Sequence, residues 1–297
     1  MNNTICRIQC TSTIKTLVFI PIILFITFSS VGCKKLELSS GWKDRKITID
    51  GENADWENAL TYIENKGIAI GLINDEAYLY VCLTTGDRQI LRQMITRGFT
   101  LWLDSEGGKG KTFGLKYPVG LMESGMPMRD MAPDSQAGQD DLSWERLQTL
   151  LVMSTTKLEL LGPGKNEITP MALAELTGID LKVGLSEGTF VYEIKVPLTV
   201  HENHPYGIGI ENGGPIGIGC EIPEIDRARM REEMAARGGG GMRGGGGGGG
   251  RRGGGMRGSG GMGGVGGGMR GKGFEMQETL KLWAIVHLAS GNDSVTK

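Results

Sequence analysis

The sequence has few of the residues that most often carry chemistry. Its 297 positions include 5 cysteines and 3 histidines, and 6% are aromatic. No Cys-x-x-Cys or other metal-type cysteine spacing occurs, which argues against zinc or redox chemistry through cysteine. Three histidines leave few general bases, and no nucleophile–base constellation is visible, so binding is favoured over catalysis. A formal net charge of −2 excludes a globally basic nucleic-acid binder.

One long apolar run is present, near the N-terminus. Residues 16–32 read TLVFIPIILFITFSSVG and are preceded by only two charged residues, both basic. A basic region, an apolar region and small residues before a cysteine are typical of a secretory signal. The ending SVGC (30–33) resembles a bacterial lipobox, with serine where leucine is usual. We expect residues 1–32 to be a lipoprotein signal peptide and Cys33 to be lipidated. A retained signal-anchor helix is the alternative.

This signal predicts a place in the cell envelope. Lys34-Lys35 follows the cysteine in place of the aspartate associated with inner-membrane retention, which favours the outer membrane. Residues 33–41 are expected to be a tether. In an oxidising envelope Cys82 and Cys220 could form a disulfide, or they could be two separate buried thiols.

The rest of the chain alternates in the period of β-strands. Segments 67–74 and 77–85, and likewise 179–185 and 189–196, indicate hairpins with short polar loops. Residues 279–289 place alternate apolar residues on one face. Short helices are expected over 87–97 and 142–153. The sequence therefore predicts a mainly β fold: one antiparallel β-sandwich domain, 42–289, with a few connecting helices and a tail at 290–297.

A glycine-rich segment interrupts this pattern before the last strand. Residues 238–273 contain 24 of the 50 glycines, six basic residues and no acidic one. Such a composition cannot bury enough apolar surface to offset its ordering entropy, so we expect disorder. Together with a short helix opened by Pro223, it forms an expected insertion at 223–273 within the sandwich domain.

Three motifs carry a family resemblance: ITIDGENADWENA (47–59), AYLYVCLTT (77–85) and FTLWLD (99–104). They are similar to the carbohydrate-binding module family 9-like group, related to DOMON domains. Asp50, Gly51, Asp55 and Trp56 match the Asp-Gly turn, acidic residue and tryptophan of that group. The run from 98 to 120 also resembles lipoproteins of Bacteroidota-like bacteria. The resemblance implies a β-sandwich whose relatives bind sugars and, in some branches, haem.

Exposed tryptophans are the candidate ligand-binding residues, because the family's sugar sites rest on paired tryptophans. Trp56 and Trp102 are expected in the core, with Asp50, Gly51 and Trp56 in structural roles. Trp283 lies on the opposite face of the expected last strand from Leu282, so it is expected to be accessible. The candidates are Trp283, Trp144 and Trp42. We expect a lipid-anchored envelope protein that binds a glycan or another small envelope ligand, without a cofactor.

Two other functions stay open. One is a structural or interaction protein whose basic glycine-rich segment contacts an envelope protein partner or the membrane surface. The other is haem or copper carriage. For copper the candidate ligands are Met126, Met128 and Met131, because soft thioethers select copper(I). The pair His201 and His204 is expected to be a surface loop rather than a metal site.

Overall fold

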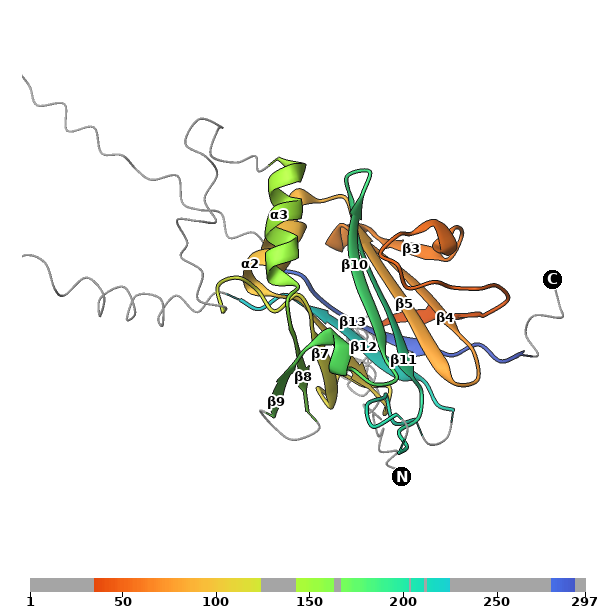
Figure 1. Ribbon diagram of the computed structural model, residues 1–297. Helices are drawn as coiled ribbons and strands as arrows, with labels where there is room; N and C mark the ends of the chain where they lie inside the picture. The colour runs from red at the N-terminus through yellow and green to blue at the C-terminus, as the bar shows by residue number, and fades with distance from the viewer. Residues whose placement is uncertain are drawn as a thin grey trace, which may run out of the picture. The chain divides into compact units, whose positions relative to one another are not determined.

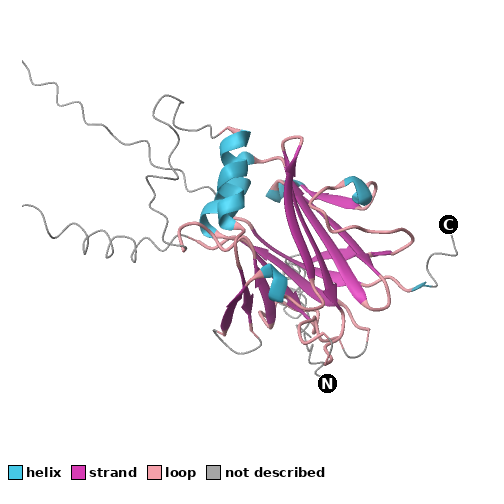
Figure 2. Cartoon of the chain, viewed as in Figure 1, coloured by secondary structure: helices cyan, strands magenta, loops and turns pink. Residues whose placement is uncertain are grey.

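Two β-sheets make up most of the structure, which is a computed structural model (Figures 1 and 2). It describes residues 35–123, 143–162, 167–202, 204–210, 213–224 and 279–291. From residue 37 on, the described residues belong to one compact unit. The expected signal peptide, Cys33, the methionines Met126, Met128 and Met131, and the glycine-rich segment 238–273 lie outside the described residues.

The first sheet has seven strands in the order β1-β13-β12-β6-β7-β8-β9. The pairs from β13 to β9 are all antiparallel. Its strands are β1 (Leu36–Ser39), β6 (Thr100–Asp104), β7 (Phe113–Lys116), β8 (Leu158–Leu161), β9 (Ile168–Met171), β12 (Ile216–Glu221) and β13 (Lys281–His287). Within the expected tether 33–41, residues 36–39 therefore form a sheet strand instead of a bare linker.

The second sheet has six strands in the order β10-β11-β5-β4-β2, with β3 also pairing with β4. The β2–β4 pair is parallel, and the other pairs are antiparallel. Its strands are β2 (Gly41–Trp42), β3 (Leu60–Ile63), β4 (Ile68–Asn74), β5 (Tyr78–Thr85), β10 (Asp180–Ser186) and β11 (Thr189–Pro197). Both expected hairpins, β4–β5 and β10–β11, are confirmed.

Two α-helices lie next to each other beyond the sheets (Figure 2). The side chain of Asp87 accepts hydrogen bonds from two backbone amides at the start of α2 (Arg88–Arg97), as its sequence predicts. The side chain of Ser143 caps α3 (Trp144–Ser154). Within the described ranges the chain also forms three short 3-10 helices: η1 (Ala54–Trp56), η2 (Glu64–Lys66) and η3 (Leu173–Glu175). Within the described ranges, no helix combines the length and apolarity needed to cross a bilayer.

The main core lies between the inner faces of the two sheets, as expected of a sandwich. The central strands β4, β5, β11 and β12 are buried at nearly every position. Between the sheets, the rings of Phe99 and Tyr192 meet edge to face with centroids 5.1 Å apart. The core includes Leu79, Leu83, Ile194, Leu101, Leu103, Leu115, Ile218, Leu282 and Val286. Cys82 and Cys220 are both buried and both free, so the structure holds two separate thiols.

The outer face of the six-stranded sheet carries a second, smaller core. Residues 47–60 cross this face and pack Trp56 and Ile47 against Tyr80, Cys82 and Val191. No strand forms at 43–53, although Ile47 and Ile49 alternate like strand residues. Ile47 and Ile49 alternate with polar residues because one side of this irregular segment packs on the sheet. Residues 206–210 show a similar alternation and also form no strand.

The insertion connects two neighbouring strands. Glu221 of β12 lies opposite Lys281 of β13, and the Ile222 N–H donates to the Leu280 carbonyl at 2.9 Å. The chain thus leaves the sheet after β12 and returns beside the same point to form β13. In β13, Leu282, Ala284 and Val286 are buried on one face, as the alternation predicts.

Candidate functional site

The outer face of the seven-stranded sheet carries two tryptophans. In β6, Leu101 and Leu103 point into the core, so Trp102 between them points outward. In β13, Leu282 and Ala284 point inward, so Trp283 points outward in the same way. Both indoles are half-buried.

Glycines make room for these indoles. Gly219 of β12 lies opposite Trp283 on one side and Trp102 on the other, so the tryptophans are two strands apart. A methyl group at Gly219 would come within 2.7 Å of the Trp283 ring, and one at Gly114 within 2.6 Å of the Trp102 ring. Each six-membered ring therefore lies across a glycine of the adjacent strand, a position that a side chain there would block.

One carboxylate joins the two tryptophans. The Trp102 Nε1–H donates to Glu221 Oε2 at 3.2 Å, and the Trp283 Nε1–H donates to Glu221 Oε1 at 3.2 Å. The Lys111 ammonium also contacts Glu221 and lies 5.1 Å from the centre of the Trp102 ring. Burial alone would raise the pKa of Glu221, but the bonds from Lys111 and Trp283 lower it overall. The carboxylate is thus ionised at neutral pH and holds both rings in place.

A hollow of about 390 Å³ borders Trp102 and Glu221, whereas Trp283 is not among its lining residues. One of its lining lysines, Lys116, forms ion pairs: its Nζ contacts Glu123 and lies 3.7 Å from Glu159 Oε2. Six charged residues line it, three of each sign: Lys111, Lys116, Lys281, Glu159, Glu221 and Glu224. The remaining wall is apolar or neutral: Thr100, Trp102, Leu161, Ile168, Ile222, Pro223 and Thr279.

This arrangement suits a polar ligand with flat apolar faces. A pyranose ring presents C–H groups that stack on an aromatic face and hydroxyls that bond to flanking carboxylates and ammonium groups. The lining charges balance, so the hollow favours no net charge in its ligand.

The structure brings only one of the predicted ligand tryptophans to this face. Trp283 is here, whereas Trp144 starts α3 beside Arg88, whose guanidinium lies 5.1 Å from its ring. Trp42 lies in β2, on the six-stranded sheet, near Gly291. These three tryptophans do not form one site.

The expected core position of Trp102 is wrong. Trp102 is half-buried on the outer face and shares Glu221 with Trp283. The signal was in the sequence: Leu101 and Leu103 alternate around Trp102 as apolar residues alternate around Trp283. Glu221 follows the same pattern: Ile218 and Cys220 of β12 point inward, so Gly219 and Glu221 point outward.

The family motif forms part of the fold and lies on the other sheet. Trp56 is fully buried, and its Nε1–H donates to Glu193 Oε1 at 2.6 Å. The backbone N–H groups of Asp50 and Gly51 donate to Glu193 Oε2 at 3.0 and 2.6 Å. Asp55 Oδ2 accepts from the Thr48 N–H at 2.8 Å. All four motif residues thus fix the segment that covers this sheet.

Within the described ranges, no group of three or more His, Cys, Asp and Glu side chains could hold a metal ion. His201 and His204 form an isolated β-bridge with ring centroids 4.5 Å apart, and His204 Nε2 lies 3.3 Å from the Tyr78 hydroxyl.

The similarity of this chain to known proteins is low. No family model matches the chain, and no curated protein matches it. Among solved structures, it is similar to a carbohydrate binding module family 9 from Caldicellulosiruptor kristjanssonii in complex with glucose. That match has 14% identity, covers 65% of this chain and 80% of the other, and has a TM-score of 0.28. The same module in complex with cellotriose matches with 16% identity, 66% and 79% coverage and a TM-score of 0.28.

Proposed function

We propose that this chain is a lipid-anchored, non-catalytic envelope protein that binds a neutral glycan on the outer face of its seven-stranded sheet. Trp102 and Trp283 stack on sugar rings, and Glu221 with Lys111 bonds to sugar hydroxyls at the edge of the rings. The single observation that carries the proposal is the shared carboxylate, because it fixes two half-buried indoles side by side over glycines.

The geometry favours an oligosaccharide over a single sugar. Adjacent strands lie about 4.8 Å apart, so tryptophans two strands apart have backbones separated by about 10 Å. That spacing spans more than one pyranose unit. A β-1,4-linked glucan exposes flat apolar faces on successive rings and is therefore the first probe.

The test is isothermal titration of the purified full chain with glucose, cellotriose, cellohexaose and an α-linked maltohexaose of equal length. We expect saturable binding of an oligosaccharide, tighter for six units than for three and weakest for glucose. A folded protein that binds none of these neutral sugars would contradict the proposal. In that case the interaction-protein alternative becomes the better account, and removal of residues 238–273 would then abolish capture of its partner.

Lipid anchoring is proposed from the SVGC ending at 30–33. Expressed in a bacterial host with an alkyne-labelled fatty acid, the full chain should incorporate label and fractionate with the outer membrane. The Cys33→Ala variant should incorporate none, whereas Cys6→Ala should label like the parent. A parent chain that takes up no label yet stays with the membrane would contradict the anchor and favour a retained signal-anchor helix.

A further inference from the structure

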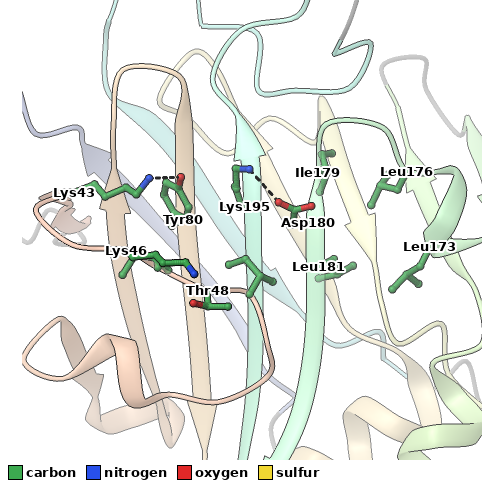
Figure 3. Close-up of a pocket in the computed structure, with 12 residues that line it drawn as sticks. Lys43, Lys46, Thr48, Tyr80, Leu173, Leu176, Ile179, Asp180, Leu181 and Lys195 are labelled. Atoms are coloured by element: carbon green, nitrogen blue, oxygen red, sulfur yellow. Dashed lines mark hydrogen bonds and ion pairs between the residues drawn. The ribbon is translucent and has the colours of Figure 1, made fainter.

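A second hollow lies on the outer side of the six-stranded sheet and plays no part in the proposed glycan site. It has a volume of about 550 Å³, within the range of small-molecule sites. Segment 43–49, which covers this sheet, forms one side, and residues 173–181 form the other (Figure 3). Its floor includes Tyr80 of β5 and Lys195 of β11, which lie directly opposite each other in the sheet.

The lysines and the leucines of the lining come from different sides, with Ile47 and Ile49 in the segment of Lys43 and Lys46, and Asp180 in the segment of the leucines. Figure 3 shows Lys43, Lys46 and Tyr80 on one side and Leu173, Leu176 and Leu181 on the other, with Lys195 between them. The Lys43 ammonium donates to the Tyr80 hydroxyl at 2.9 Å, and the Lys195 ammonium lies 4.2 Å from the centre of the Tyr78 ring. These contacts hold two of the three ammonium groups at the edge of the hollow.

The charges here do not balance, in contrast to the tryptophan face. Lys43 pairs with Asp75 at 3.1 Å, and Lys195 pairs with Asp180 at 3.0 Å. Lys46 also lines the hollow, and across the described ranges it has no ion-pair partner. The bond to Tyr80 raises the pKa of Lys43. Burial would lower the pKa of Lys195, but Asp180 raises it overall, so both stay charged at neutral pH. One positive charge is left uncompensated.

We infer that this hollow binds a monoanion with an apolar body, a monocarboxylate such as a medium-chain fatty acid. The carboxylate would lie at the Lys46 ammonium, within reach of the Thr48 hydroxyl, and the chain would lie on Leu173 and Leu176. A single uncompensated charge suits a monoanion. Such a ligand would use both kinds of lining: its carboxylate would accept a charge-assisted hydrogen bond from the lysine, and its hydrocarbon chain would contact the leucines.

The test is titration of the full chain with hexanoate, and with 1-hexanol and hexylamine as neutral and cationic molecules of the same length. We expect hexanoate to bind at least about tenfold more tightly than either, which is about 1.4 kcal/mol. The Lys46→Gln variant should lose this preference while its affinity for 1-hexanol stays the same. The matched control is Lys157→Gln, which removes an exposed lysine outside the hollow.

Two further measurements separate this inference from the glycan site. Leu173→Ser should weaken hexanoate and 1-hexanol alike, because it removes apolar wall from both. Trp102→Ala should leave hexanoate binding unchanged, so the two sites can fail independently. Equal affinity for hexanoate and 1-hexanol in the folded parent protein, or a Lys46→Gln variant that keeps the full preference for the anion, would overturn the inference.

Discussion

The outer faces of the two sheets use the same pairing of tryptophan and glutamate in opposite ways. On the six-stranded sheet, Glu193 accepts from the Trp56 indole, and both are fully buried under the chain's own segment 47–60. On the seven-stranded sheet, Glu221 accepts from the Trp102 and Trp283 indoles, which stay half-buried. The first pair is fully covered, and the second keeps part of its indole surface exposed.

The electrostatics of the two carboxylates differ accordingly. Burial dominates at Glu193 and raises its pKa, although Trp56, Gly51 and Asp50 donate to it. Glu221 has the ammonium of Lys111 in addition to its indole donors, and its pKa is lowered. A pairing of tryptophan and acid is therefore not evidence of a ligand site by itself. What decides is whether the chain itself covers the rings.

The largest expected effect is on stability at the six-stranded sheet. Trp56→Ala removes a fully buried ring and leaves Glu193 without one of its donors, so it should lower the free energy of unfolding by about 3–5 kcal/mol. Trp283→Ala, at the seven-stranded sheet, should cost about 1 kcal/mol. Urea denaturation measures both. Equal losses at the two positions would remove the distinction between a structural and a binding tryptophan.

The carboxylate of the six-stranded sheet comes next. Glu193→Gln replaces an acceptor by an amide NH₂ that cannot serve all three N–H donors, so we expect a loss of about 1–3 kcal/mol. The exposed Glu187→Gln is the control and should change stability by less than about 0.5 kcal/mol. A Glu193→Gln variant as stable as the parent would show that the buried network does not hold segment 47–60.

A smaller loss of stability should follow when a methyl group is added at a glycine that an indole of the seven-stranded sheet lies across. In Gly219→Ala the new methyl would lie 2.7 Å from the Trp283 ring, so the ring must move away from Glu221. We expect a stability loss of about 1 kcal/mol and a clear loss of oligosaccharide affinity. Gly86→Ala is the control, because nothing lies within 4 Å of a methyl there. Unchanged affinity in Gly219→Ala would mean that the position of this ring does not matter for binding.

The smallest effects are in pH dependence, and their signs are opposite. A raised pKa in the folded state means that the contribution of Glu193 is present below the unfolded value, 4.5, and is lost as pH rises through the folded value. The lowered pKa of Glu221 means that its contribution is present above 4.5 and is lost as pH falls through the folded value.

Unfolding of the parent, Glu193→Gln and Glu221→Gln at several values between pH 3 and 7 measures this difference. As pH rises, the stability of the parent relative to Glu193→Gln should fall, whereas its stability relative to Glu221→Gln should rise. Parallel curves for the two variants would contradict the contrast between the carboxylates.

Much of the fold could be predicted from the sequence, because alternation alone identifies strands whose inner face is buried. The hairpins β4–β5 and β10–β11 and the last strand β13 follow from it directly. The irregular segment at 43–53 was harder, because a segment that packs one side on a sheet shows the same alternation as a strand. Short edge strands such as β1 depend on pairing with β13 and carry little local signal.

The site could be predicted only in part. That Trp283 points outward follows from its neighbours, and Trp102 could have been read in the same way. Their meeting at Glu221 could not, because it depends on β12 lying between β6 and β13, strands far apart in the sequence. The second hollow is harder still, since its lining comes from four separate stretches of the chain.

The most direct test is the oligosaccharide affinity of four full-chain variants, measured by titration alongside their free energies of unfolding. These are Trp102→Ala, Trp283→Ala, their double variant, and Trp144→Ala, which removes a half-buried tryptophan elsewhere. The account predicts that each single variant on the outer face of the seven-stranded sheet loses at least about tenfold in affinity. The double variant should not bind measurably, and Trp144→Ala should bind like the parent. Undiminished binding by a folded double variant would contradict the assignment of this face as the ligand site.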